Sequence, residues 1–160
     1  MGKILTQEKA IETANRIHNQ NKTIVLAGGC FDILHIGHIE FFKKAKEKGD
    51  FLFIILESDE TIRKTKGKNK PINQQEDRAK ILESIEIIDF IVPISEFSDK
   101  DYDRLISAIK PEIIATTYGD PFRSHKERQA RAVNGKVLNV IRKISNKSTS
   151  HLASLIEQDI

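Results

Sequence analysis

The fold is decided by residues 23–42, whose sequence is TIVLAGGCFDILHIGHIEFF. The stretch begins with a β-branched apolar run at 23–27, continues through two glycines, and ends in an amphipathic segment that opens at His35. This order predicts a buried strand, a tight turn and a helix, which is the unit that builds nucleotide-binding α/β domains. Gly28 and Gly29 fit that unit because a residue without a Cβ lets the backbone pass close to a phosphate.

Two histidines stand at the start of the predicted helix. His35 and His38 are three positions apart, so on a helix their side chains share one face. At a helix N-terminus the free backbone N–H groups and the helix dipole attract an anion. The pair is therefore placed to contact a phosphate, and we interpret it as functional rather than as a surface feature.

The rest of the chain alternates helices and strands. An amphipathic helix is expected at 5–21, before the first strand, and the helix that opens at His35 should run to residue 48. Further strands are expected at 51–56, 90–94, 113–117 and 136–141, and further helices at 75–85, 101–109 and 123–133. Such alternation predicts right-handed crossovers and a parallel sheet. The expected fold is an α/β, Rossmann-like three-layer sandwich with a central five-stranded parallel sheet.

Two segments are rich in basic residues. Residues 61–70, TIRKTKGKNK, are expected to form a loop that follows the second strand and folds over a triphosphate. Residues 123–136 carry five basic side chains against the single acid Glu127, and Arg123 at their start is placed to reach an acceptor phosphate. A solvated surface run is the alternative interpretation of both segments.

Composition limits the classes of protein to consider. The 160 residues predict one domain spanning 1–160, and a net charge of +3 suits small polyanionic ligands better than nucleic acid. The single cysteine, Cys30, excludes an internal disulfide and fits the reducing cytoplasm. No apolar run approaches the ~20 residues of a membrane span, so we expect no membrane association. A homodimer is compatible with the sequence.

The stretch GCFDILHIGH resembles the H-x-G-H signature of the nucleotidyltransferase (cytidylyltransferase-like) superfamily. Over nearly the whole chain the pattern is similar to the heptose 1-phosphate adenylyltransferase domain. The similar motifs are Ser58-Asp59, Lys66-Gly67, Pro71-Ile72-Asn73 with Arg78, Gly119-Asp120, and Ser148-Thr149-Ser150. The chain departs from that pattern in two places: at 117–121, where K-G-G-D-Y is usual, and around 146–150.

The resemblance implies roles for particular residues. Three are expected to be catalytic: His35, His38 and Lys66. Eleven are expected to bind the nucleotide: Gly28, Gly29, Cys30, Phe31, Asp32, Gly37, Arg78, Gly119, Asp120, Ser148 and Thr149. Lys64 and Arg123 are expected to bind the acceptor. No metal held by side chains alone is expected; Mg²⁺ would be held mainly by the nucleotide phosphates.

The implied reaction is transfer of AMP from ATP to a phosphorylated small molecule, with release of pyrophosphate. Because the acceptor phosphate is already largely dianionic at neutral pH, such chemistry needs positioning and charge neutralisation rather than a general base. We favour a sugar 1-phosphate such as heptose 1-phosphate. Glycerol-3-phosphate cytidylyltransferase with CTP, FMN adenylyltransferase, and a non-catalytic nucleotide-sensing module remain alternatives.

Overall fold

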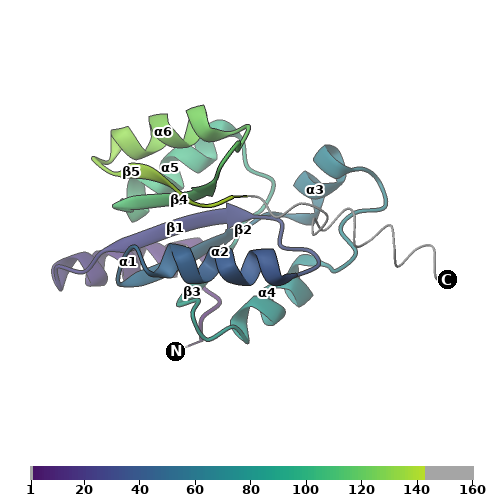
Figure 1. Ribbon diagram of the computed structural model, residues 1–160, viewed down its shortest axis with the longest axis horizontal. Coiled ribbons are helices and arrows are strands. Elements are labelled where there is room, and N and C mark those ends of the chain that lie inside the picture. The colour runs from purple at the N-terminus through teal and green to yellow at the C-terminus, as the bar shows by residue number, and fades with distance from the viewer. Residues whose placement is uncertain (1, 143–160) are drawn as a thin grey trace.

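The computed structural model describes residues 2–142, and residues 1 and 143–160 lie outside that part. Within it, five strands form one parallel sheet in the order β3-β2-β1-β4-β5 (Figure 1). They are β1 (Ile24–Gly29), β2 (Phe51–Leu56), β3 (Phe90–Pro93), β4 (Ile113–Thr117) and β5 (Lys136–Ile141). The chain adds strands on one side of β1 and then returns to its other side. The carboxyl ends of β1 and β4 therefore form the switch point at which open α/β sheets bind ligands.

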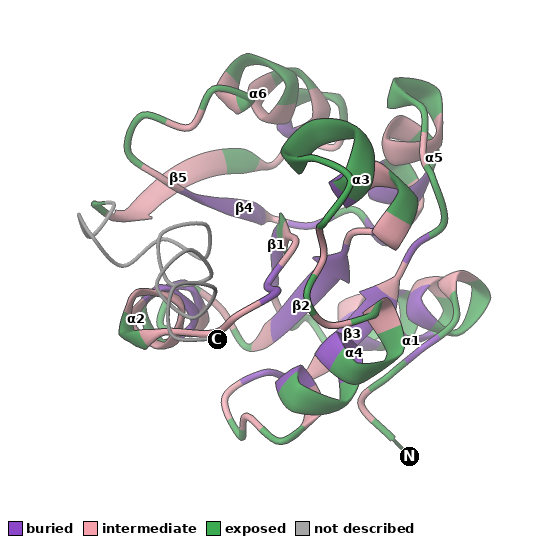
Figure 2. Ribbon diagram, turned by 90° about the vertical axis from the view of Figure 1, so that its right-hand side faces the viewer, coloured by how far each residue is buried: buried purple, intermediate pink, exposed green. Residues whose placement is uncertain are grey.

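Helices cover both faces of this sheet. They are α1 (Gln7–Asn19), α2 (Ile36–Lys46), α3 (Asp59–Lys66), α4 (Gln75–Glu83), α5 (Asp99–Ile109) and α6 (Arg123–Ala132). One apolar cluster joins the sheet to α1, α5 and α6, and a second joins its other face to α2 and α4 (Figure 2). The predicted three-layer α/β sandwich with a five-stranded parallel sheet is confirmed.

Strand β2 shows why the sequence makes a sheet covered on both faces. Its side chains alternate, so Phe53 and Ile55 enter the cluster under α1 and α5 while Ile54 and Leu56 enter the cluster under α2 and α4. Phe53, Ile54 and Leu56 are fully buried. Burial of a side chain of this size stabilises a fold by about 1.5–3 kcal/mol.

The N-terminal segment protects one edge of the sheet. Leu5 donates its backbone N–H to the carbonyl of Ile91, and Ile91 donates to the carbonyl of Lys3, each at 2.8 Å. Ile4 therefore forms a parallel bridge with Ile91 along β3. An edge strand with unpaired backbone groups is prone to join other chains, and this short segment covers it. The first helix begins at Gln7 with Thr6 as its N-cap, two residues after the predicted start at residue 5.

The prediction of a loop at 61–70 is wrong for its first half. Helix α3 runs through Asp59–Lys66, with Ser58 as its N-cap accepting from the backbone N–H of Thr61 at 3.1 Å. Ile62 is buried, which anchors this short helix to the body. The acidic first turn and basic last turn both match the helix dipole. These signals outweigh the high density of positive charge that had suggested a loop.

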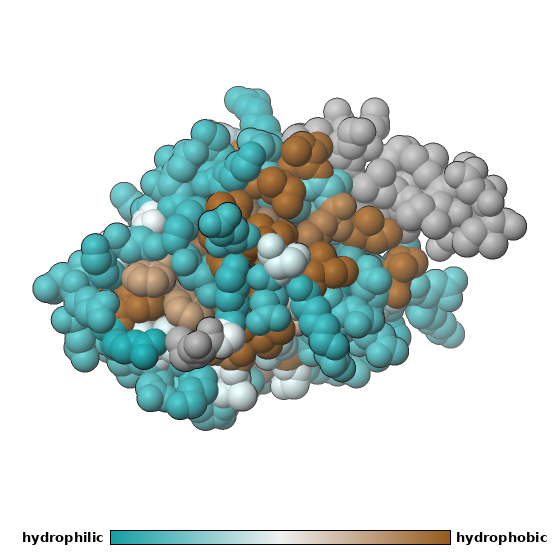
Figure 3. Space-filling view, turned by 90° about the horizontal axis from the view of Figure 1, so that it is seen from below, coloured by the Kyte–Doolittle hydropathy of each residue, from teal (hydrophilic) through white to brown (hydrophobic). Residues whose placement is uncertain are grey.

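The outer surface of the described residues is largely hydrophilic, with apolar side chains showing between the polar ones on the face in Figure 3. The large apolar side chains that are exposed include Ile36, Ile72 and Ile81. None of the helices in the described part is both long and apolar enough to cross a membrane.

Gly135, between α6 and β5, offers a test of close packing. We expect Gly135→Ala to lower the free energy of unfolding by about 1–3 kcal/mol. A methyl group there would lie 2.5 Å from the carbonyl oxygen of Pro111 and 3.1 Å from that of Glu112. Urea unfolding measures the change, with Gly2→Ala as control because the nearest atom to its added Cβ is 3.6 Å away. Equal unfolding midpoints for the two variants would contradict this account of the packing.

Candidate functional site

The start of α2 is capped by the two histidines themselves. His35 is the N-cap residue, and its Nδ1 accepts from the backbone N–H of Gly37 at 3.1 Å. The Nδ1 of His38 accepts from the backbone N–H of His35 at 3.3 Å, which completes a reciprocal capping box. Because each Nδ1 is an acceptor, each neutral ring carries its proton on Nε2. Both rings therefore present an N–H donor, the group that a phosphate oxygen requires.

His38 is held in its neutral form. Its ring packs against Phe31, with ring centroids 5.5 Å apart, and lies 3.9 Å from the ring of His35. Burial, followed by the nearby His35 and Lys66, lowers the pKa of His38 from 6.5 to about 4. Phe31 adopts a left-handed backbone conformation with φ 46°, which turns the chain from β1 toward α2. At neutral pH His38 is thus a neutral hydrogen-bond donor rather than a cation.

A cavity of about 700 Å³ lies at the switch point between β1 and β4. It has the size of a ligand pocket for a nucleotide. The end of β1, the start of α2 and the end of α3 bound it on one side, and β4, the turn after it and the end of β5 bound it on the other. Its lining includes eight of the predicted site residues: Gly28, Phe31, His35, Gly37, His38, Lys66, Gly119 and Asp120.

The turn after β4 forms the opposite wall. Asp120 accepts hydrogen bonds from the Thr116 hydroxyl, the Lys126 ammonium and the backbone N–H of Phe122. Burial opposes ionisation of Asp120, but the bonds from Lys126 and Thr116 prevail and lower its pKa. Gly119 has φ 77°, a conformation that suits glycine in a tight turn. The wall therefore contains a fixed carboxylate and a cation that line the cavity together.

Arg78 lies under the cavity rather than along it. Its side chain is fully buried, and it donates to the carbonyls of Asn73, Cys30 and Glu57 at 3.0, 2.6 and 2.9 Å. It also forms an ion pair with Asp59 at 2.7 Å. These bonds tie the ends of β1 and β2 to α3 and α4. These donors of Arg78 are directed into the protein, and its predicted contact with the nucleotide or substrate stays a prediction.

Asp32 also has a structural partner. Its carboxylate accepts from the backbone N–H groups of Ile72 and Asn73 at 2.7 and 2.8 Å. The Asn73 amide donates back to the Asp32 carbonyl at 3.0 Å. Asp32, which is buried, thereby fixes the segment between α3 and α4 and does not line the cavity.

Four other predicted residues do not line the cavity either. Lys64 forms an ion pair with Glu96, and Arg123 pairs with Glu127 at 2.9 Å and donates to Asn139. Gly29 is the last residue of β1 and Cys30 follows it, and neither lines the cavity. Burial raises the pKa of the Cys30 thiol. The predicted phosphate contacts at Ser148 and Thr149 lie outside the described residues.

Sequence reasoning missed several lining residues. Lys126 belongs to the basic segment 123–136, within which the sequence prediction named only Arg123 as a ligand contact. The turn that contains Asp120 is the sequence feature that could have identified Lys126, because it brings the start of α6 to the same wall. Tyr118, Phe122 and Arg142 also line the cavity, and the guanidinium of Arg142 lies 5.2 Å from the centroid of the Tyr118 ring.

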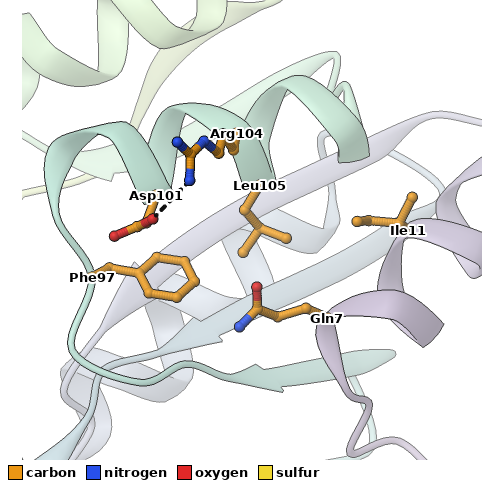
Figure 4. Close-up of a pocket in the computed structure, with 6 residues that line it drawn as sticks. All are labelled: Gln7, Ile11, Phe97, Asp101, Arg104 and Leu105. Carbon is orange, nitrogen blue, oxygen red and sulfur yellow. Dashed lines mark hydrogen bonds and ion pairs between the residues drawn. The ribbon is translucent and has the colours of Figure 1, made fainter.

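A second hollow of about 200 Å³ lies between α1 and α5 (Figure 4). It is lined by Gln7, Ile11, Phe97, Asp101, Arg104 and Leu105. Asp101 is engaged in capping α5 through Ser98 and pairs with Arg104. None of the predicted site residues lines this smaller hollow, so the larger cavity is the candidate site.

Fold and site together define a Rossmann-like nucleotide-binding α/β domain with a pair of histidines at the switch point of its sheet. The chain belongs to the cytidylyltransferase-like family, whose family model matches residues 26–155.

Relatives in this family include bifunctional proteins named HldE. That of Aliarcobacter butzleri is 42% identical over 111 residues, covering 69% of this chain and 23% of that protein. That of Helicobacter pylori strain J99 is 45% identical over 112 residues, covering 70% and 23%. That of Campylobacter fetus is 35% identical over 142 residues, covering 89% and 30%. The chain therefore matches less than a third of the length of these relatives.

Solved structures share the fold. The lipopolysaccharide core biosynthesis protein from Thermoplasma volcanium superposes with a TM-score of 0.61 at 26% identity, covering 77% of this chain and 97% of that one. Pantoate–β-alanine ligase from Francisella tularensis superposes with a TM-score of 0.62 at 15% identity, covering 91% and 69%. The second likeness concerns the fold alone.

The lowered pKa of His38 predicts how stability changes with pH. Between the folded pKa of about 4 and the ordinary value of 6.5, the unfolded chain binds more protons than the folded one. Stability should therefore fall as the pH drops through this window, by about 2 kcal/mol from His38 at about pH 5. His38 should contribute no such slope above 6.5.

Urea unfolding of the wild type and of His38→Asn at about pH 7 and about pH 5 measures this contribution. We expect the loss of stability between the two conditions to be larger in the wild type. Equal losses in the two proteins would show that His38 is not held neutral by the fold.

Proposed function

We propose that this chain is an adenylyltransferase that transfers AMP from ATP to a phosphorylated small molecule and releases pyrophosphate. The observation that carries the proposal is the convergence of two imidazole N–H donors and Lys66 on one cavity at the switch point. Membership of the cytidylyltransferase-like family supports it. In the reaction, an acceptor phosphate oxygen forms a bond to the α-phosphorus of ATP. The bond from that phosphorus to the bridging oxygen breaks, and pyrophosphate leaves with the electron pair.

The residues suit a reaction between two anions. His38 stays neutral, so it donates to the phosphates without needing a counter-charge when the site is empty. Lys66 lies at the last turn of α3 and brings a positive charge to the cavity from the side opposite the Asp120 turn. Lys126 adds a second cation at that turn. Fixed donors of this kind stabilise the charge that develops on the leaving pyrophosphate.

A divalent cation, Mg²⁺, is part of the proposal. In the described residues, no group of three or more His, Cys, Asp or Glu side chains is placed to hold a metal ion. The proposed Mg²⁺ is bound mainly by the phosphates of the nucleotide, the usual arrangement for this ion. When bound, the ion would neutralise charge on the triphosphate.

The acceptor that we favour is a sugar 1-phosphate such as heptose 1-phosphate. Support comes from the resemblance described above and from the identity of 35–45% with the HldE proteins. Glycerol 3-phosphate with CTP and FMN with ATP remain the alternatives. A cytoplasmic location and a homodimer also belong to the proposal.

The decisive assay measures pyrophosphate release with ATP or CTP against heptose 1-phosphate, glycerol 3-phosphate and FMN. We expect turnover with ATP and the sugar phosphate, and a loss of about 10²-fold to 10³-fold in His38→Ala, or ~3 kcal/mol. Unchanged circular dichroism would confirm that this variant folds. Turnover confined to CTP or to FMN would overturn the acceptor, and His38→Ala activity above about a tenth of wild type would overturn its catalytic role.

Lys66→Ala should weaken the use of ATP, because this lysine gains its anionic partner when the triphosphate is bound. A charge-assisted contact contributes about 1.5–3 kcal/mol, which corresponds to a rise of about 10- to 100-fold in KM for ATP. Lys68→Ala is the matched control, since Lys68 follows two positions later and does not line the cavity. The same kinetics in both variants would show that Lys66 is a solvated surface lysine.

A further inference from the structure

A carboxylate and a phenol meet beside the cavity without a role in the reaction described so far. Glu57 follows β2 directly, and its backbone N–H donates to the carbonyl of Gly29 at 3.1 Å. The strand alternation that sends Phe53 and Ile55 toward α5 therefore extends to Glu57. There the Tyr102 hydroxyl from α5 lies 2.6 Å from each carboxylate oxygen of Glu57.

Tyr102 alone does not saturate this carboxylate. A carboxylate offers about four acceptor positions, whereas one hydroxyl supplies one proton. Among the described residues, the hydrogen bonds to the Glu57 carboxylate come from Tyr102. Burial raises the pKa of Glu57, and the bond from Tyr102 and the charges of Arg78 and Lys126 oppose that rise. The half-buried carboxylate of Glu57 can therefore accept further hydrogen bonds. Leaving a buried acceptor without a partner costs free energy.

Glu57 does not itself line the cavity. It lies next to a residue that does, because its backbone N–H bonds to Gly29, the chain neighbour of the lining residue Gly28, and its side chain is on the α5 and α6 face of the sheet. Lys126, which lines the cavity, is close enough to act on its charge. Between β2 and β4 stands Gly28, and a Cβ built on it would meet only Ile55, at 3.8 Å or more. The missing side chain leaves space at the edge of β1 between the end of β2 and the cavity wall. A ligand in the cavity would have to extend past Gly28 to reach Glu57.

The order of the strands separates Glu57 from the other parts of the site. The turn after β4 brings the rings of Tyr118 and Phe122 to the cavity, and aromatic rings suit a nucleobase. The paired histidines follow β1 and suit phosphates. Glu57 follows β2, on the far side of β1 from β4, and α3 lies in front of these strand ends (Figure 2). The region around Glu57 is therefore left for the second substrate, the acceptor.

We propose that Glu57, positioned by Tyr102, binds hydroxyl groups of the acceptor and so selects a polyhydroxylated phosphate such as a sugar phosphate. The proposal rests on the function proposed above and specifies the substrate class of that site. A carboxylate accepts hydrogen bonds from two neighbouring hydroxyls at once, which is how a site distinguishes a sugar from an acceptor that lacks them. Sites built to bond a hydroxyl reject analogues without it much more strongly than apolar pockets reject a misfit.

Steady-state kinetics with ATP, heptose 1-phosphate and its monodeoxy analogues test this role. We expect Glu57→Ala to raise KM for the acceptor about 10- to 100-fold and to leave KM for ATP within about twofold. The wild type should discriminate against at least one deoxy analogue, and the variant should lose that discrimination. Tyr102→Phe should give a smaller effect of the same kind, because it removes the donor that orients Glu57.

The matched control is Glu60→Ala, which removes an exposed carboxylate of α3 that pairs with Arg63. It should leave both KM values unchanged. Glu57→Gln keeps an oxygen for Tyr102 and tests the role should Glu57→Ala fold poorly. An acceptor KM unchanged in Glu57→Ala or Glu57→Gln, with deoxy discrimination retained, would overturn the proposal. A rise confined to KM for ATP would also overturn it and would assign Glu57 to the ribose.

Calorimetric binding of heptose 1-phosphate, in the presence of a non-hydrolysable ATP analogue, separates this proposal from the proposed function. Weaker binding to Glu57→Ala than to the wild type supports the role of Glu57 whether or not turnover occurs. Turnover by the wild type with undiminished binding by the variant overturns the role of Glu57 alone. A wild type that neither binds nor uses a sugar phosphate overturns both.

Discussion

The site depends on one buried cation, the guanidinium of Arg78. Isolated in an apolar interior, such a charge would cost many kcal/mol, but here it donates to three backbone carbonyls and one carboxylate. Those carbonyls belong to Cys30 at the end of β1, Glu57 at the end of β2 and Asn73 before α4. Strand ends normally leave carbonyls without partners, so Arg78 supplies the bonds that a longer strand would have supplied. It thereby fixes the rim from which Phe31, the histidines and α3 are positioned.

Around this fixed rim the charges are arranged for ligands that are themselves anions. A neutral His38 beside the ammonium of Lys66 avoids placing two positive charges next to each other. Lys126 is held by Asp120, so the positive charge of this second cation is partly neutralised within the protein. The site therefore offers N–H donors in fixed directions at a limited electrostatic cost to the fold.

Much of the fold and of the cavity could be predicted from the sequence, but the partners of several charged side chains could not. Strands follow from apolar runs. The site residues predicted from the sequence include His35, His38, Lys66 and Asp120, which the structure brings together around one cavity. Arg78, Asp32, Lys64 and Arg123 were assigned to ligands, but the structure gives each of them partners within the protein. A motif shows which residue types occur together, but it does not show whether a charge satisfies the backbone or a ligand. Helix α3 was not predicted, because its N-cap, Ser58, lies before the basic run and the charge density of that run indicated a loop.

The same alternation that builds the core also divides the tasks of the site between the two faces of the sheet. Along β1 and β2, residues that point toward α2 continue into the helix start that carries the histidines, while residues that point toward α5 continue into Glu57. Gly28 lies in β1, between the histidines at the start of α2 and Glu57 after β2. It has no side chain to fill the space at the edge of the strand. A molecule bound across this edge reaches phosphate donors on one face and a hydroxyl acceptor on the other. On the acceptor role proposed for Glu57, joining a nucleotide to a phosphorylated polyol would use both kinds of contact.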